Sequence, residues 1–168
     1  AQFDIKKATW INHLHIKEGS TKKIIEAFGK KFDELVSILG EEKSNQVISL
    51  VKERLNLIVD LQKEVGFFLN SPSSYDPKVL NKLNKEEALI VLKFCTLEVR
   101  VSKDSAAIKE GLFRESTKNK ISFGQTMKTL RLAIVGALRG PDLFKIVEII
   151  GTDEALKRIN KLTKTLKQ

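Results

Sequence analysis

The sequence is poor in the residues that build cross-links, metal sites and irregular chains. It contains one cysteine (Cys95), two histidines, three prolines and nine glycines among 168 residues. One cysteine cannot form an internal disulfide, which is typical of a reducing compartment, and this Cys/His set is too small for an ordinary zinc site. The low proline and glycine content excludes collagen-like and low-complexity chains. The composition predicts a globular protein of the cytoplasm.

Long hydrophobic runs are also missing. No run approaches the ~18 consecutive apolar residues of a transmembrane helix, and residues 1–7 lack the apolar core of a secretory signal. The chain is 42% hydrophobic and 30% charged, which is enough apolar material for one domain or two small ones. No membrane partner is expected.

Catalytic motifs are absent from the sequence. Neither G-x-x-x-x-G-K-[ST] nor G-x-G-x-x-G occurs, and no serine or cysteine stands in a nucleophile elbow. His13 and His15 are two residues apart and point to different sides of a helix. The carboxylate pairs Glu41/Glu42 and Glu86/Glu87 fall at predicted helix starts, where they favour the helix dipole. We expect no catalytic residue, metal ligand or cofactor in this chain.

Charge is distributed unevenly along the chain. The net charge is +9; residues 1–100 hold 16 Lys and Arg against 14 Asp and Glu, whereas residues 101–168 hold 14 against 7. A basic C-terminal part is typical of a protein that binds a polyanion such as nucleic acid. The alternative interpretation is that these charges only keep the protein soluble.

Helical spacing of apolar residues dominates, and strand signals are scarce. We predict an all-α fold with two helical subdomains, 1–100 and 101–168. Gly40 ends a helix, Asn56 marks a bend, and residues 70–74 form the clearest loop. The expected helical segments are 3–15, 21–28, 32–39, 43–69, a restart at 77, 88–99, 106–115, 123–138, 141–150 and a last helix after residue 151.

Arg54 is unusual because apolar residues occupy every neighbouring position of a helix through residues 47–61. A guanidinium in an apolar stripe needs acceptors, or its desolvation costs several kcal/mol. Two interpretations follow: Arg54 forms a buried structural ion pair or reaches the edge of the core, or packing holds it as a rigid donor for a base or phosphate.

Arg131 repeats this pattern, with Lys128 on the same face of the predicted helix. A glycine-proline turn follows at residues 139–143, and such a turn presents backbone N–H groups beside a helix start. Arginine donors, open backbone and the nearby Leu143 suit recognition of an unstacked base. An ordinary helix-turn-helix connection is the alternative.

The last helix places cations opposite an apolar stripe. The stripe is Leu156, Ile159, Leu162 and Leu166, and the cations are Lys157, Arg158, Lys161, Lys164 and Lys167. A solvated face is the plain interpretation. If RNA lies nearby, these cations attract phosphate in a salt-dependent way.

Several stretches resemble the anticodon-binding region of bacterial-type glutamyl-tRNA synthetases. Residues 123–136 (FGQTMKTLRLAIVG) and the turn 139–144 (RGPDLF) are similar to its C-terminal motif, and residues 149–159 to its ending. Residues 3–16, with Phe3-Asp4, Lys7 and Trp10-Ile11-Asn12, resemble its opening. Glu53-Arg54, Phe67-Phe68-Leu69 and Tyr75-Asp76 fit the middle.

The resemblance implies two helical subdomains that form an α-helix cage, the anticodon-binding domain of a class I aminoacyl-tRNA synthetase. The "HIGH" and "KMSKS" signatures of the family's ATP site do not occur. The implied parent is a cytoplasmic glutamate–tRNA ligase that uses ATP and Mg, and its catalytic domain would belong to the same polypeptide. The implied partner is tRNA(Glu), with tRNA(Gln) as a second candidate. The expected state is a monomer.

The resemblance also assigns roles to residues. Arg131 with Gly140, Pro141 and Leu143 would meet the first and middle anticodon bases, and Arg54 the third. Arginine at this last position leans towards discrimination against tRNA(Gln). Contacts to the tRNA backbone would fall on Lys128, Arg139, Lys157 and Lys161.

Departures from the family pattern affect these roles. Thr129 stands where the family has a proline. Gly140 stands where the family often has serine or threonine, so the hydroxyl donor is lost and only the backbone of the turn can contact a base. A helical protein-interaction module with a basic surface is the alternative function. It predicts a protein partner and salt-sensitive binding to acidic vesicles.

Overall fold

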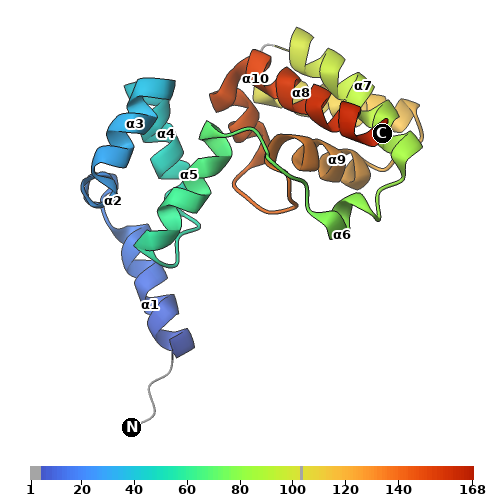
Figure 1. The fold of residues 1–168 in the computed structure, drawn as a ribbon. Coiled ribbons are helices and arrows are strands. Elements are labelled where there is room, and N and C mark those ends of the chain that lie inside the picture. The colour runs from blue at the N-terminus through green and yellow to red at the C-terminus, as the bar shows by residue number, and fades with distance from the viewer. Residues whose placement is uncertain (1–4, 103) are drawn as a thin grey trace. The chain divides into compact units, whose positions relative to one another are not determined.

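The computed structural model describes residues 5–102 and 104–168, and every described element is helical (Figure 1). This confirms the all-α prediction. The opening motif at Phe3-Asp4 lies outside the described residues, as do the side chains of Lys7 and Trp10. No described helix has the length and apolar character that crossing a membrane requires.

The chain divides into two compact units at residues 69/70. The expected boundary near residue 100 lies inside the second unit, because the helix over residues 85–101 packs on three later helices. The charge asymmetry is also present at the observed boundary. Residues 1–69 carry 11 Lys and Arg against 10 Asp and Glu, whereas residues 70–168 carry 19 against 11.

The first unit is built around α4. The helices α2, α3 and α5 each pack directly on α4. Its elements are α1 (Ile5–Glu18), α2 (Thr21–Phe28), α3 (Lys30–Leu39), α4 (Glu41–Lys52), the 3-10 turn η1 (Ile58–Asp60) and α5 (Leu61–Leu69). Ser20 caps α2. Gly40, at φ 80°, ends α3, as predicted.

The predicted helix over residues 43–69 is interrupted. α4 ends at Lys52, and residues 53–57 form turns that include the expected bend at Asn56. α1 is attached to this segment: the ring nitrogen Nδ1 of His13 lies 2.7 Å from the backbone oxygen of Leu55, and Asn12 donates to that of Asn56. The interruption therefore serves as the anchoring point for α1.

The second unit is a bundle in which α10 packs on α7, α8 and α9. Asp76 caps the first helix, Asn84 the next, and Ser122 caps α9. The elements are α6 (Pro77–Leu80), α7 (Lys85–Val101), α8 (Ser105–Lys118), α9 (Phe123–Val135) and α10 (Leu143–Leu166).

α8 and α9 end at residues other than those predicted. α8 continues to Lys118 because Ser116 is buried and its hydroxyl lies 2.8 Å from the hydroxyl of Thr126 on α9. α9 stops at Val135, where Gly136 takes a left-handed conformation. Gly151 takes a non-helical conformation within α10, at φ 81° and ψ 167°. This agrees with the prediction that one helix ends at residue 150 and another begins after residue 151.

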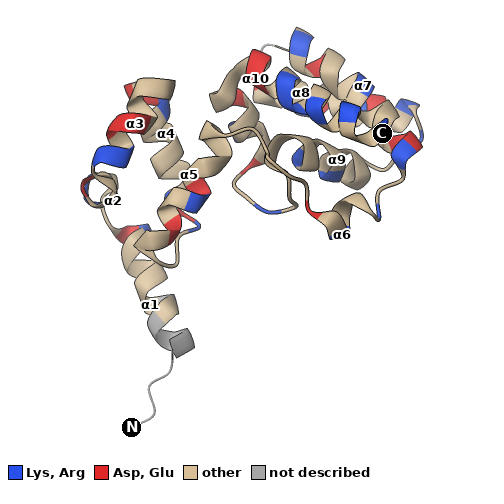
Figure 2. Ribbon diagram, viewed as in Figure 1, with Lys and Arg blue, Asp and Glu red and all other residues tan. Residues whose placement is uncertain are grey.

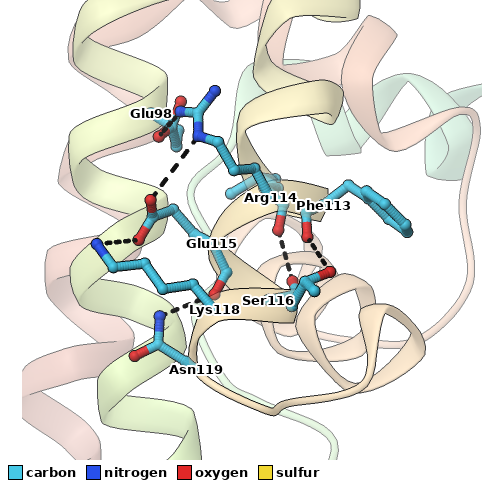
Figure 3. Close-up of polar contacts among 9 residues, drawn as sticks. Glu98, Phe113, Arg114, Glu115, Ser116, Lys118 and Asn119 are labelled. Carbon is cyan, nitrogen blue, oxygen red and sulfur yellow. Dashed lines mark hydrogen bonds and ion pairs between the residues drawn. The ribbon is translucent and has the colours of Figure 1, made fainter.

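Glu98 joins α7 to α8 (Figure 3). Its carboxylate accepts a hydrogen bond from Arg114 Nη2 at 3.0 Å, and Glu98 is only 8% exposed. Gly111 lies so close that a Cβ there would be 1.9 Å from the Glu98 carboxylate. Arg114 and Glu98 therefore act as a polar tie at the surface of this bundle.

Candidate functional site

The turn between α9 and α10 carries three of the predicted site residues, Arg139, Gly140 and Pro141. Gly136 ends α9 at φ 83°, a left-handed backbone conformation that residues with a Cβ rarely adopt. A Cβ at Gly136 would also lie 2.7 Å from the backbone oxygen of Ser74 and 3.0 Å from Pro72. Only glycine lets the turn pass this close to the loop at residues 70–76.

Arg131 braces the turn from within α9. Its Nη1 atom donates a hydrogen bond to the backbone oxygen of Pro141 at 2.9 Å, and the residue is half-buried. Asp142 then caps α10 by accepting from the backbone nitrogen of Lys145 at 2.9 Å. The structure thus brings Arg131 and the predicted Gly140-Pro141 turn into direct contact.

Side chains of the turn differ in exposure. Leu143 is 1% exposed and Pro141 is buried, so their side chains belong to the core of the second unit. Leu143 therefore cannot present its side chain to a base, contrary to the sequence-based picture of a leucine beside the base. Leu138 is 43% exposed on the same turn, next to exposed Arg139. The predicted helix over residues 123–138 includes Leu138 in its apolar stripe, so the exposure of this side chain was not expected.

Arg54 does not lie in an apolar stripe. It falls in the turn after α4, is exposed, and its Nε atom lies 3.1 Å from Glu64 Oε2. Its side chain is 39% exposed, whereas that of Glu64 is 15% exposed. The prediction of a guanidinium embedded among apolar side chains is wrong. An ion pair at the protein surface orients Arg54 instead.

The arginine that is buried is Arg158. It is fully enclosed, its Nε lies 2.9 Å from Glu154 Oε1, and its Nη1 donates to the backbone oxygen of Ile134 at 2.9 Å. The prediction that Arg158 belongs to the solvated face of α10 is wrong. Helical spacing could have revealed it, since Arg158 is three residues from Ala155 and four from Leu162, which are both buried.

The lysines predicted to contact the tRNA backbone differ in their surroundings. Figure 2 shows the Lys and Arg positions of the second unit in blue. Lys128 is exposed on α9. Lys157 is 74% exposed and lies 3.5 Å from Glu154. Lys161 donates to the backbone oxygen of Pro72, so it also ties the 70–76 loop to α10.

Three titratable groups among the described residues have clearly shifted pKa values. Burial raises the pKa of the Cys95 thiol, with the nearby Glu98 charge adding to the effect. Burial raises the pKa of Tyr75 to about 12. Hydrogen bonds from Lys145 and Ser105 lower the pKa of Glu148. Among the described residues, no three His, Cys, Asp or Glu side chains gather in a way that could hold a metal ion.

An all-helical chain with a basic second unit and an arginine-braced turn fits the class of RNA-recognition domains. The family model described as the anticodon binding domain matches residues 22–163. The chain belongs to this family. This membership favours the RNA-recognition hypothesis over the helical protein-interaction module.

Curated relatives carry the same indication. The chain is 32% identical over 167 residues to a glutamate–tRNA ligase of Flavobacterium johnsoniae and 34% identical over 168 residues to one of Porphyromonas gingivalis. Each alignment covers 99% of this chain but 33% of the relative. The chain therefore spans about a third of the length of these relatives.

Solved structures agree with the fold. A glutamate tRNA ligase of Elizabethkingia meningosepticum, crystallised with its amino acid, matches with a TM-score of 0.86 and 31% identity, covering 99% of this chain and 33% of that one. The glutamate–tRNA synthetase of Elizabethkingia anophelis matches with a TM-score of 0.82 and 30% identity, over 98% and 32% of the two chains. The similarity to the glutamyl-tRNA synthetase region, which the motifs indicated, is confirmed.

Proposed function

We propose that this chain reads the anticodon loop of tRNA(Glu) for a glutamate–tRNA ligase whose catalytic part lies in the same polypeptide. The observation that carries the proposal is the hydrogen bond from Arg131 to the Pro141 backbone, which fixes a guanidinium beside an exposed turn of a basic unit. Family membership supplies the class of ligand, and the relatives' names supply the amino acid.

Arg131 and the turn would act on the first and middle anticodon bases. A guanidinium offers several N–H donors in one plane, and bonding one of its nitrogens to Pro141 sets the orientation of that plane. Gly140 has no side chain of its own to stand between its backbone and an approaching base edge. Leu138 rather than Leu143 would supply the apolar contact.

Arg54 would act on the third base from the first unit. Glu64 holds its guanidinium at 3.1 Å, and a partly exposed arginine held by a carboxylate pays less ordering entropy on binding than a mobile one. Arg54 would discriminate against tRNA(Gln) if it donates a hydrogen bond only to the third anticodon base of tRNA(Glu).

Exposed cations would add attraction that does not depend on sequence. Lys128, Arg139 and Lys157 are exposed on the second unit, and contacts between lysine and phosphate weaken as salt rises. Lys161 would contribute less, since its ammonium group already donates to Pro72.

ATP and Mg would belong to the catalytic part, and this chain would act as a monomer in the cytoplasm. In this division of labour the chain selects the tRNA, and the ligation of glutamate takes place elsewhere in the parent enzyme.

Binding of the purified chain to tRNA(Glu) transcripts tests the proposal. Affinity should fall when the anticodon is permuted and the rest of the tRNA is unchanged. A salt series should weaken both complexes similarly, because phosphate contacts are shared. Equal affinity for the two transcripts would contradict the proposal, and salt-sensitive binding to acidic vesicles in place of tRNA would favour the interaction module.

A further inference from the structure

Arg158 is a charged side chain with no access to solvent in the core of the second unit. It is 0% exposed, and its contacts run to two elements: Glu154 one turn earlier on α10, and the backbone of Ile134 at the end of α9. Enclosing a guanidinium carries a large desolvation penalty, and an apolar residue of similar volume often stabilises a core as well or better. The position of Arg158 therefore calls for a reason other than filling space.

The Ile134 contact falls where α9 needs a partner. The last four carbonyl groups of a helix have no intrahelical donor, and a cation near them is favoured by the helix dipole. Arg158 Nη1 satisfies the Ile134 oxygen at 2.9 Å, two residues before Gly136 turns left-handed. It thus fixes the end of α9 at the point where the turn begins.

The same helix end carries the proposed base reader. Arg131 lies three residues before Ile134 on α9, and it holds the far side of the turn through the oxygen of Pro141 at 2.9 Å. Two arginines therefore bracket residues 136–142: Arg158 fixes the start of the turn to α10, and Arg131 fixes its end to α9.

We propose that Arg158, oriented by Glu154, is a positioning residue that sets how the 136–142 turn is presented to the anticodon, and thereby sets discrimination between anticodons. The inference rests on the proposed function. A core residue that only fills volume would change the stability of the whole unit. A positioning residue changes the order of this turn and the preference between bases at temperatures where the unit stays folded.

Arg158→Met tests the proposal, because methionine retains a long unbranched stem and removes the donors. Glu154→Gln is the milder variant: the Glu154 side chain is 29% exposed, and its replacement keeps an oxygen for Arg158 Nε. Arg114→Met is the matched control. It removes another carboxylate-paired arginine of the same unit, with a side chain that is 63% exposed and whose ion pairs run to Glu98 on α7 and Glu115 on α8.

The first readout is the affinity ratio for anticodon stem-loops with the glutamate anticodon and with a permuted one, well below the Tm of each variant. We expect Arg158→Met to lower this ratio about tenfold, equivalent to about 1.4 kcal/mol, and Glu154→Gln to lower it less. Arg114→Met should lower the Tm and keep the ratio. An unchanged ratio in both folded Arg158 and Glu154 variants would overturn the proposal.

The second readout does not need RNA. The amide of Gly136 donates to Leu132 at 2.8 Å, and that of Asp76 donates to Gly136 at 2.8 Å. We expect hydrogen exchange at both amides to accelerate in Arg158→Met, while the amide of Asn119 at the end of α8 keeps its rate. Uniform acceleration at all three sites would contradict positioning.

The two readouts separate the two proposals. If the unmodified chain binds both stem-loops equally, the proposed function fails, and exchange at Gly136 and Asp76 decides whether Arg158 orders the turn. If Arg158→Met does not fold, Glu154→Gln carries the test. Wild-type exchange together with a wild-type ratio in that variant would then overturn the inference.

Discussion

The backbone nitrogen of Asp76 donates a hydrogen bond to the backbone oxygen of Gly136, with 2.8 Å between the two atoms. This bond attaches the 70–76 loop, which follows the last helix of the first unit, to the turn that carries the candidate site. Lys161 separately attaches the same loop to α10 by donating to the Pro72 oxygen. The loop that enters the second unit and the turn at the end of α9 therefore form one structural feature.

Replacing Gly136 should destabilise this feature. Gly136→Ala places a Cβ 2.7 Å from the Ser74 oxygen and forces a left-handed conformation on alanine, at a cost of about 1–3 kcal/mol in the free energy of unfolding. Chemical denaturation of the second unit measures the loss.

Gly124→Ala on the same helix is the control for Gly136→Ala. No atom lies within 4 Å of a Cβ at Gly124, and alanine there should stabilise α9 by up to about 1 kcal/mol. A Gly136→Ala variant as stable as Gly124→Ala would show that the close approach to Ser74 is not maintained in solution.

Arg54→Ala should alter preference at the third anticodon base with little effect on stability. The ion pair with Glu64 is partly exposed, and such pairs contribute about 0–1 kcal/mol. Binding to stem-loops varied at that base, measured beside a thermal melt, checks both parts.

Lys17→Ala provides the comparison for Arg54→Ala. Lys17 forms a similar exposed ion pair with Glu53, with 3.0 Å between the charged atoms, and its loss should leave base preference intact. A loss of about 4 kcal/mol in Arg54→Ala with unaltered base preference would instead indicate a structural ion pair.

Cys95 should make the second unit less stable in alkali. Burial raises the pKa of its thiol, so the folded state holds the proton more tightly than the unfolded state. The resulting stability is fully present below the unfolded pKa, about 8.5, and falls by up to about 1.4 kcal/mol per pH unit above it.

Denaturation of wild type and Cys95→Ala between about pH 8.5 and 9.5 measures this slope, before an ordinary tyrosine with a pKa of about 10 titrates. The variant should be less stable at neutral pH, because a buried side chain is shortened, but its stability should depend less on pH. Parallel slopes would contradict the assignment to Cys95.

The sequence predicts most helices because their signals are local. Ser20, Asp76, Asn84 and Ser122 cap the helices that follow them, and Gly40 and Gly151 interrupt helical backbone. Capping chemistry and left-handed glycines act over a few residues and are visible without tertiary contacts.

The misplaced Arg54 and the distant acceptor of Arg158 show where local reasoning ends. Apolar spacing over residues 47–61 implied one helix around Arg54, but the chain turns after Lys52 and leaves Leu57, Ile58 and Val59 at least 40% exposed. Arg158 was assigned to solvent because of its charge, although its acceptor at Ile134 comes from another helix. Neither the turn nor that acceptor can be derived from helical periodicity.

The domain boundary depended on weighing two signals. The predicted loop at residues 70–74 lies at the observed boundary, whereas the increase in positive charge after residue 100 does not coincide with it. α7 ends at Val101 and still packs on α8, α9 and α10, so a change in composition there does not mark the end of a folding unit. Packing across helices distant in sequence decides the boundary.

A double-mutant cycle between Arg131 and the first anticodon base tests the central claim most directly. Binding is measured for wild type and Arg131→Ala, each with the glutamate anticodon and with the first base replaced. If Arg131 reads that base, the two changes are coupled by about 1–3 kcal/mol. Additive losses, with no coupling beyond error, would contradict the assignment of Arg131 and its turn as the anticodon reader.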